Sequence, residues 1–336
     1  MDMDKKTRKR LSSLFWVAVA VVLVWFCLRS IDWKQFRDAL ELCRWGYVIL
    51  SMVLGVLVFY IRGNRWRMML LPFDPSTSRI TTFNAYNICM AVNLAVPRAG
   101  EIARLGYAVK HSALDGSGNR LLSFDKALGT LFIERAWDAI VTLGMAAVLL
   151  LVKWDSFGGF LVESLSGMGG STLLWVLLGL VLLGLAALLW MAYAFRERGR
   201  IWGKIWGFIA GIGSGLGSFL KMKKAWLFLV YTAFIWLIYW LMSVCIVWAL
   251  QDIEAFASLT LTDAFFLMIA GSISSVVPVP GGFGAYHGVV CSALLSIWGI
   301  PMGTGMIFAT LNHESQVLTQ ALSGLASYVH ENFFRR

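Results

Sequence analysis

Charged residues are scarce in this chain: 14% of its 336 residues are Asp, Glu, Lys or Arg, whereas 59% are hydrophobic. With a mean hydropathy of +0.72, this composition excludes an ordinary soluble domain. Several apolar runs approach or exceed the roughly 20 residues that a helix needs to cross about 30 Å of hydrocarbon. The sequence therefore predicts an all-α, polytopic membrane protein.

Paired cysteines and the common catalytic motifs are absent. There is no Cys-x-x-Cys, Gly-x-x-x-x-Gly-Lys-Ser/Thr, His-Glu-x-x-His or Gly-x-Ser-x-Gly, and no soluble stretch is long enough for a catalytic domain. We therefore expect no disulfide framework, no metal site, no cofactor and no enzyme activity. The scattered cysteines lie mostly in apolar runs, where a free thiol acts as a small hydrophobe: Cys27, Cys43, Cys89, Cys245 and Cys291.

The net charge of +10 comes largely from loops and chain ends that border apolar runs. A nucleic-acid partner would require these charges on one soluble face, so contact with anionic lipid head groups explains them better. The 16 Trp and 22 Phe residues fit aromatic belts at the two membrane interfaces.

Six crossing helices are predicted. The first follows the basic N-terminus 1–10, and its length and lack of a cleavage site before Arg29 favour a retained anchor over a signal peptide. A mixed-charge link, 29–44, leads to the second helix, and a loop containing Arg62, Arg65 and Arg67 follows that helix. The predicted crossings are 11–28, 47–61, 124–152, 173–194, 226–250 and 304–329, with a shallow interfacial helix at 205–220.

Lys and Arg residues predict the orientation. The segments 155–171 and 251–263 contain neither residue, whereas both chain ends and the other loops are basic. The positive-inside rule therefore places the N- and C-termini in the cytoplasm and the protein in the inner (cell) membrane. The link 29–44 is the one basic loop that this arrangement leaves outside.

The motif Val-Pro-x-x-Gly interrupts two apolar stretches, at Pro97 in the first half of the chain and at Pro278 in the second. Each stretch is read as a re-entrant, broken helical hairpin, 80–96 with 100–109 and 264–277 with 284–298. Paired breaks of this kind are typical of transport sites, because hydrocarbon cannot satisfy the freed backbone groups.

The two halves of the chain contain the same elements in the same order: a span, a broken hairpin and a second span. The two halves have opposite orientations in the membrane. We therefore predict one transmembrane domain, 11–330, containing inverted pseudo-repeats 46–152 and 225–329, followed by a cytoplasmic tail, 331–336. Glu134 follows the first break proline by 37 residues, and Glu314 follows the second by 36.

Glu134, Arg135 and Asp138 lie well inside a predicted crossing helix. Each charge at bilayer depth costs about 2.5–3.5 kcal/mol on insertion scales, so these residues need partners or water. Glu134 and Asp138 share a helix face, while Arg135 points about 100° away and can reach another helix. They form either a substrate site or an internal ion pair that locks this helix.

Four residues surround the first break: Arg98, Gly100, Glu101 and Arg104. Gly100 begins a half-helix whose free N–H groups and positive dipole end favour an anion. Glu101 and Arg104 are neighbours on one helix face. A phosphate group is the ligand expected here, although the arginines also fit cytoplasmic positive-inside residues.

The second break contains Pro280, Gly281 and Gly282, which combine fixed and unrestricted φ angles for a sharp turn. It either approaches a ligand or packs two helices closely. His287 follows the break, and Glu314 stands beside His313 in the last span. These acid and imidazole groups form a second candidate site, with helix packing as the alternative role of His287.

The chain resembles the lysylphosphatidylglycerol synthase transmembrane (flippase-like) family over most of its length. In that family the domain is thought to move lipids between leaflets, often beside a cytoplasmic synthase domain, which is missing here. Family members commonly carry Glu where this chain has His287, so a cationic lysyl-lipid substrate is not expected. The motifs that carry the resemblance are Pro97-Arg98-Ala99-Gly100-Glu101 with Arg104, Glu134-Arg135 with Asp138, and Pro280-Gly281-Gly282-Phe283-Gly284.

These observations predict a protein that binds or flips an anionic phospholipid or a polyprenyl-phosphate lipid. Arg98, Arg104 and Arg135 would hold the phosphate, and the nearby carboxylates would position them. The alternatives are a membrane-embedded enzyme or an accessory subunit beside a separate lipid-modifying enzyme or glycosyltransferase, and a proton-coupled solute transporter using Glu134, His287 and Glu314.

Overall fold

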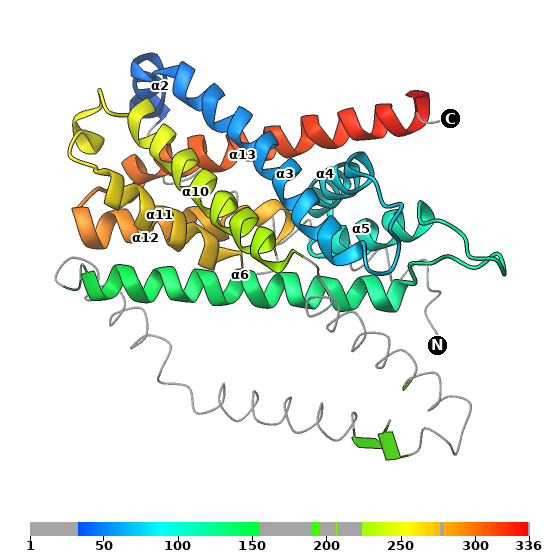
Figure 1. Ribbon diagram of the computed structural model, residues 1–336. Coiled ribbons are helices and arrows are strands. Elements are labelled where there is room, and N and C mark those ends of the chain that lie inside the picture. The colour runs from blue at the N-terminus through cyan, green and yellow to red at the C-terminus, as the bar shows by residue number, and fades with distance from the viewer. Residues whose placement is uncertain are drawn as a thin grey trace, which may run out of the picture.

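The computed structural model describes residues 33–152, 154, 190–191, 193–194, 206, 224–275 and 279–334. These residues are predominantly helical, which confirms the prediction of an all-α membrane protein (Figure 1). The elements are α2 (Trp33–Leu42), α3 (Trp45–Leu70), α4 (Arg79–Ala95), α5 (Ala99–Lys110), α6 (Phe124–Val152), α10 (Ala225–Ala249), η1 (Glu254–Phe256), α11 (Leu261–Ser274), η2 (Pro280–Gly282), α12 (Ala285–Trp298), α13 (Met302–Val329) and η3 (His330–Phe334).

Most predicted helix bounds agree with the structure. The bounds of α6 are those predicted, and both breaks separate two helices as expected. The predicted segments 11–28, 155–171, 173–194 and 205–220 lie wholly or almost wholly outside the described residues, as do positions 276–278 at the second break.

The prediction of an arginine-containing loop after position 61 is wrong. Helix α3 continues to Leu70, so Arg62, Arg65 and Arg67 are all helical. Charge alone does not end a helix, and the first proline after this point is Pro72, just beyond the helix end. The link 29–44 also differs from the prediction, because its residues 33–42 form the helix α2.

The order of elements is the same in the two halves of the chain. A long helix, two short helices separated by a break, and a second long helix occur as α3–α6 and again as α10–α13. The first helices of the two halves pack antiparallel: the Arg44 N–H, at the start of α3, donates to the Ala249 carbonyl, at the end of α10, at 2.9 Å. Figure 1 shows these two helices side by side.

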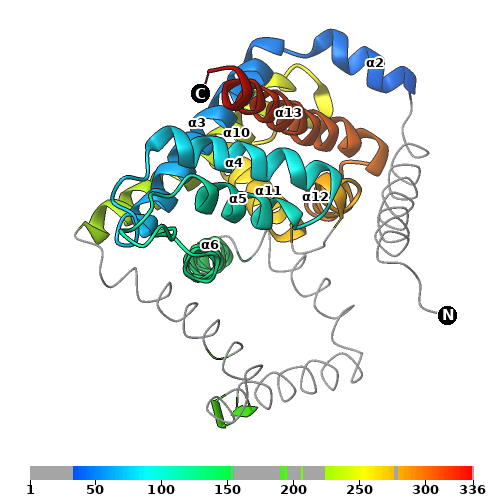
Figure 2. The ribbon, with the colours of Figure 1, turned by 90° about the vertical axis from the view of Figure 1, so that its right-hand side faces the viewer.

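The four short helices lie between the long helices α13 and α6 (Figure 2). Glycines allow close approach here: a Cβ at Gly324 of α13 would collide with the Ala91 side chain of α4. Close helix packing on small residues is typical of membrane proteins, because in lipid the helices associate through van der Waals contacts and not through the hydrophobic effect. The breaks are therefore held in the middle of the bundle.

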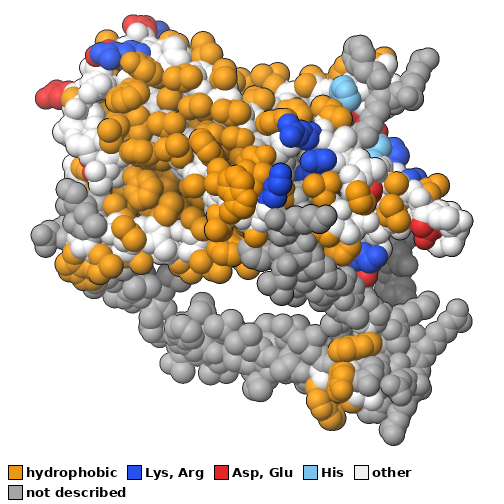
Figure 3. All heavy atoms as spheres, viewed as in Figure 1, with side chains coloured by type: hydrophobic (Ala, Val, Ile, Leu, Met, Phe, Trp, Pro, Cys, Tyr) orange, Lys and Arg blue, Asp and Glu red, His pale blue; other side chains and the backbone are white. Residues whose placement is uncertain are grey.

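Large apolar side chains cover much of the outer surface. Leu143 and Leu151 of α6 are 69% and 83% exposed, and Ile49 and Val53 of α3 are each 59% exposed. In Figure 3 the apolar side chains dominate the left and centre of one face, and the basic side chains lie toward its right. Such an extensive apolar surface is suited to lipid. In the described ranges, α3 and α10 are long and apolar enough to cross a membrane.

Candidate functional site

The first break is a tight turn with an unusual backbone conformation. Val96 is extended, and Arg98 has a left-handed backbone (φ 63°) at the start of α5. A left-handed non-glycine residue costs on the order of 1–2 kcal/mol, and such strain often marks a functional position. The Arg98 side chain extends away from α5 and donates from Nη2 to the Ser275 carbonyl at 2.9 Å.

Gly100 has a packing role that the sequence did not reveal. Its N–H donates to Asn93 Oδ1 at 2.8 Å, so this donor is already used and is not free for an anion. A Cβ at this position would collide with the Cys89 carbonyl and the Asn93 side chain. Only glycine lets α5 begin this close to α4.

The second break depends on glycine conformation. Gly281 (φ 59°) and Gly282 (φ 80°) both have positive φ within η2, the turn that Pro280 begins. Gly281 also faces Leu94 near the end of α4. Together with the Arg98–Ser275 hydrogen bond, this contact brings the two breaks against each other, although they are far apart in sequence.

A buried cluster of charges lies beside the first break. Two carboxylates of α6 meet three arginines, two from α3 and one from α5. The shortest distances are Arg62 Nη2 to Asp138 Oδ2, 2.6 Å; Arg65 Nη2 to Asp138 Oδ1, 2.7 Å; and Arg104 Nη2 to Glu134 Oε2, 2.8 Å. Glu134 Oε1 also lies 3.7 Å from Arg62 and 3.6 Å from Arg65.

The cluster carries more positive than negative charge. Within the described residues its three guanidinium groups face two carboxylates, which leaves one positive charge uncompensated. Donor capacity is also left over: among the described residues, Nε of Arg62, Nε of Arg65, and Nε and Nη1 of Arg104 are buried without a hydrogen-bond partner. Buried charges normally have partners, so this arrangement is suited to an additional anion.

Aromatic side chains hold the arginines in place. The Arg104 guanidinium lies 4.4 Å from the centre of the Trp66 ring, and that of Arg65 lies 5.2 Å from the Phe228 ring centre. Arg62 donates to the Tyr239 hydroxyl at 2.6 Å. These contacts orient the guanidinium planes without neutralising their charge.

Arg135 forms a second pair at the edge of the cluster. Its Nη2 lies 3.6 Å from Glu101 Oε1, so Arg135 reaches α5 as its position on α6 predicted. Glu101 and Arg104 lie three residues apart in α5, as expected for neighbours on one helix face, and each pairs with a different α6 residue. The Arg135 side chain is 36% exposed and that of Arg62 is 10% exposed, whereas Arg104 is fully buried.

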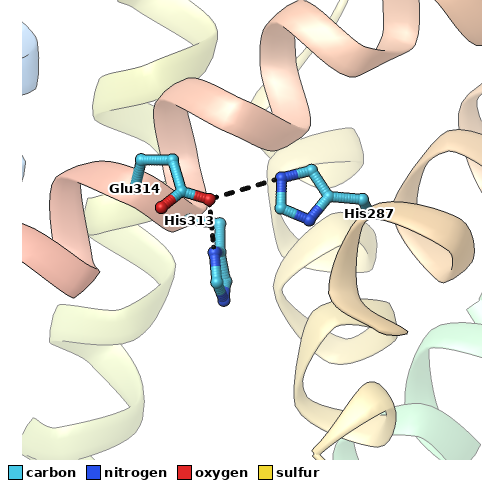
Figure 4. A group of neighbouring side chains, drawn as sticks. All are labelled: His287, His313 and Glu314. Carbon is cyan, nitrogen blue, oxygen red and sulfur yellow. Dashed lines mark hydrogen bonds and ion pairs between the residues drawn. The ribbon is translucent and has the colours of Figure 1, made fainter. Parts of the chain in front are cut away.

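The second group of candidate residues lies around η2 (Figure 4). His287 Nε2 of α12 lies 3.6 Å from Glu314 Oε1 of α13, and His313 Nδ1 lies 2.9 Å from the same oxygen. The other nitrogen of His313, Nε2, lies 2.9 Å from the Gly281 carbonyl oxygen. The structure thus brings the predicted residues His287 and Glu314 together and joins them to the second break.

Arg62 and Arg65 are the cluster residues that sequence reasoning missed. Their spacing places them on one side of a helix, but they follow the predicted helix end at position 61 and so fall in the predicted loop. From its position beside Glu314, His313 is predicted to have only a supporting role, although its ring contacts both Glu314 and the Gly281 carbonyl at the break.

The family model described as lysylphosphatidylglycerol synthase TM region matches residues 13–324. This match covers nearly the whole chain, including both breaks and both groups of candidate residues. No curated protein sequence and no solved structure gives a significant match.

Proposed function

Because this chain belongs to the lysylphosphatidylglycerol synthase TM region family, whose name places it in lipid handling, we propose that it binds and translocates an anionic lipid. The single observation that supports this proposal is the buried cluster, which within the described part of the chain has an uncompensated positive charge and N–H groups without a partner. A lipid phosphate supplies the missing negative charge and several acceptor oxygens. The lipid class is a phospholipid or a polyprenyl phosphate.

The roles of the arginines follow from their exposure and partners. Arg62 shares Asp138 with Arg65 and is the most exposed of the three cluster arginines, so it is the first of these three to meet an entering phosphate. Arg65 and Arg104 then supply fixed positive charge behind it, and the two α6 carboxylates keep the guanidinium groups apart and oriented. Arg135, paired with Glu101, lies at the edge where the phosphate enters.

In this proposal, the two broken helical hairpins give the lipid head group access to the site from opposite sides of the membrane. In an inverted repeat, α4–α5 enters the membrane from the cytoplasm and α11–α12 enters from the opposite side. The contact between Arg98 and the Ser275 carbonyl then joins the two hairpins at the middle of the bilayer. Both chain ends are cytoplasmic in this orientation, in agreement with the distribution of Lys and Arg.

The apolar outer surface gives the acyl chains a continuous route along the protein. Only the head group has to pass through the bundle, because large hydrophobic side chains already face outward from α3 and α6. The cost of moving a phosphate through hydrocarbon is reduced when fixed guanidinium groups replace its water. The lipid leaves chemically unchanged in this proposal, so no catalytic residue is required.

Reconstitution into liposomes tests the proposal. Trace lipids with a fluorescent acyl chain and different head groups are exposed to a membrane-impermeant quencher. We expect the quenched fraction to rise from about half toward completion for an anionic head group and to stay near half for a zwitterionic one. Mass spectrometry of the recovered lipid distinguishes transport from the enzyme alternative, because a new product would contradict the proposal.

A further inference from the structure

The side chains of His287, His313 and Glu314 converge from two helices at the second break. Each offers a ligand atom, and these three atoms lie within 4.8 Å of one another. Figure 4 shows both imidazole rings directed at the same carboxylate. Ligands around a tetrahedral zinc ion, with bonds of about 2.0–2.1 Å, lie roughly 3.4 Å apart. The two observed distances to Glu314, 2.9 and 3.6 Å, bracket this spacing.

The contacts of His313 require a proton or a metal ion between its Nδ1 and the Glu314 carboxylate. Its Nε2 faces the Gly281 carbonyl, which only accepts, so this nitrogen carries a proton. In a neutral imidazole, Nδ1 then presents a lone pair to the Glu314 carboxylate 2.9 Å away, and the two groups repel. A positive ion between Nδ1 and the carboxylate removes this conflict. A metal-bound histidine commonly donates its other N–H to a backbone carbonyl, as His313 does here.

His287 makes a metal ion a better explanation than a single proton. The residue is 5% exposed, so its ring nitrogens have little access to water. Its Nε2 points toward Glu314 at 3.6 Å, too far for a good hydrogen bond. A metal ion bound by Glu314 and His313 gives Nε2 of His287 a ligand bond, whereas a proton on His313 leaves Nε2 at 3.6 Å from the carboxylate.

We propose that His287, His313 and Glu314 bind a Zn²⁺ ion that joins α12 and α13 at the second break. Two imidazoles with one carboxylate favour zinc over Mg²⁺ or Ca²⁺, which prefer oxygen ligands. Three protein ligands leave a fourth position for water or for an oxygen of an anion. This proposal extends beyond lipid translocation and does not depend on it.

Zinc binding by tag-free, chelator-treated protein in detergent tests the proposal. Competition with a chromophoric chelator measures Kd and stoichiometry, and Co²⁺ replacement reports a tetrahedral site through its visible absorption bands. We expect about one Zn²⁺ per chain. His287→Ala and Glu314→Gln should each weaken binding by at least about tenfold, since even outer-shell changes cost 10–100-fold.

His111→Ala is the matched control. His111 also pairs with a carboxylate, Glu331, at 2.7 Å, but it lies outside the metal cluster. The His111→Ala protein should bind Zn²⁺ with wild-type affinity. Monodisperse wild-type protein that binds no zinc overturns the proposal, as does equal affinity in the wild type, His287→Ala, Glu314→Gln and His111→Ala. The zinc assay does not measure leaflet exchange. A negative zinc result therefore contradicts only the metal site, and the lipid proposal is tested separately by the liposome assay.

Discussion

Replacing Arg62 with glutamine removes the excess positive charge while leaving both carboxylates paired. Asp138 keeps Arg65 at 2.7 Å, and Glu134 keeps Arg104 at 2.8 Å. The variant cluster is therefore two balanced ion pairs. Because no buried charge loses its only close partner, we expect the protein to remain folded.

The expected loss is in affinity for the anionic lipid. A hydrogen bond to a charged group contributes about 1.5–3 kcal/mol, so losing the Arg62 contact should raise Kd roughly 10- to 150-fold. A short-chain anionic phospholipid titrated into detergent-purified protein gives Kd directly. The zwitterionic lipid of the same chain length should bind weakly and equally to both proteins.

Arg44→Gln is the matched control for this substitution. Arg44 also pairs with an aspartate, Asp252, but its side chain is 46% exposed and lies at the opposite end of α3 from Arg62. Its loss should change Kd less than about twofold, since exposed ion pairs contribute little. A folded Arg62→Gln protein with wild-type affinity would refute the reasoning, and so would an equal loss in both variants.

Three further changes test other parts of the structure. Arg104→Gln leaves a buried carboxylate without its close partner and should cost about 3–5 kcal/mol of stability, seen as a large fall in Tm; an unchanged Tm would contradict the buried pairing. Gly100→Ala places a methyl group against a backbone carbonyl and should lower Tm and folded yield, whereas Gly106→Ala, with open space, should not; equal Tm values would exclude the close contact. Burial acts to raise the pKa of Asp74, but hydrogen bonds from nearby hydroxyl and backbone N–H groups outweigh it and hold the pKa below its ordinary value. The stabilising contribution of Asp74 should therefore be present above pH 4 and lost as the pH falls below about 3.9; Asp74→Asn should flatten the acid side of the Tm–pH curve, and an equally steep loss in Asp74→Asn would assign it to other groups.

Hydropathy and helix-breaking residues were sufficient to predict most of the described helices. Pro97 and the glycines after Pro280 locate the two breaks, because proline removes a backbone donor and glycine permits positive φ. The charges at Glu134 and Asp138 indicated the correct region, since isolated charges at bilayer depth require partners.

The identity of those partners depends on helix packing, which local patterns do not contain. Arg65 lies 73 residues from Asp138 in sequence, yet the two form a direct ion pair. The basic residues after position 61 predict a loop, whereas α3 continues through them to Leu70. In the same way, no sequence spacing predicted that His287 and His313 would face one carboxylate.

The most direct test of the central claim is a structure of the protein in nanodiscs that contain an anionic phospholipid. We predict density for a phosphate group within hydrogen-bond distance of Arg62, with Arg65 and Arg104 behind it. The same density should be absent from nanodiscs made only of zwitterionic lipid. Phosphate density confined to exposed Lys and Arg residues, with the buried cluster unchanged, would contradict the assignment of this cluster as the lipid head-group site.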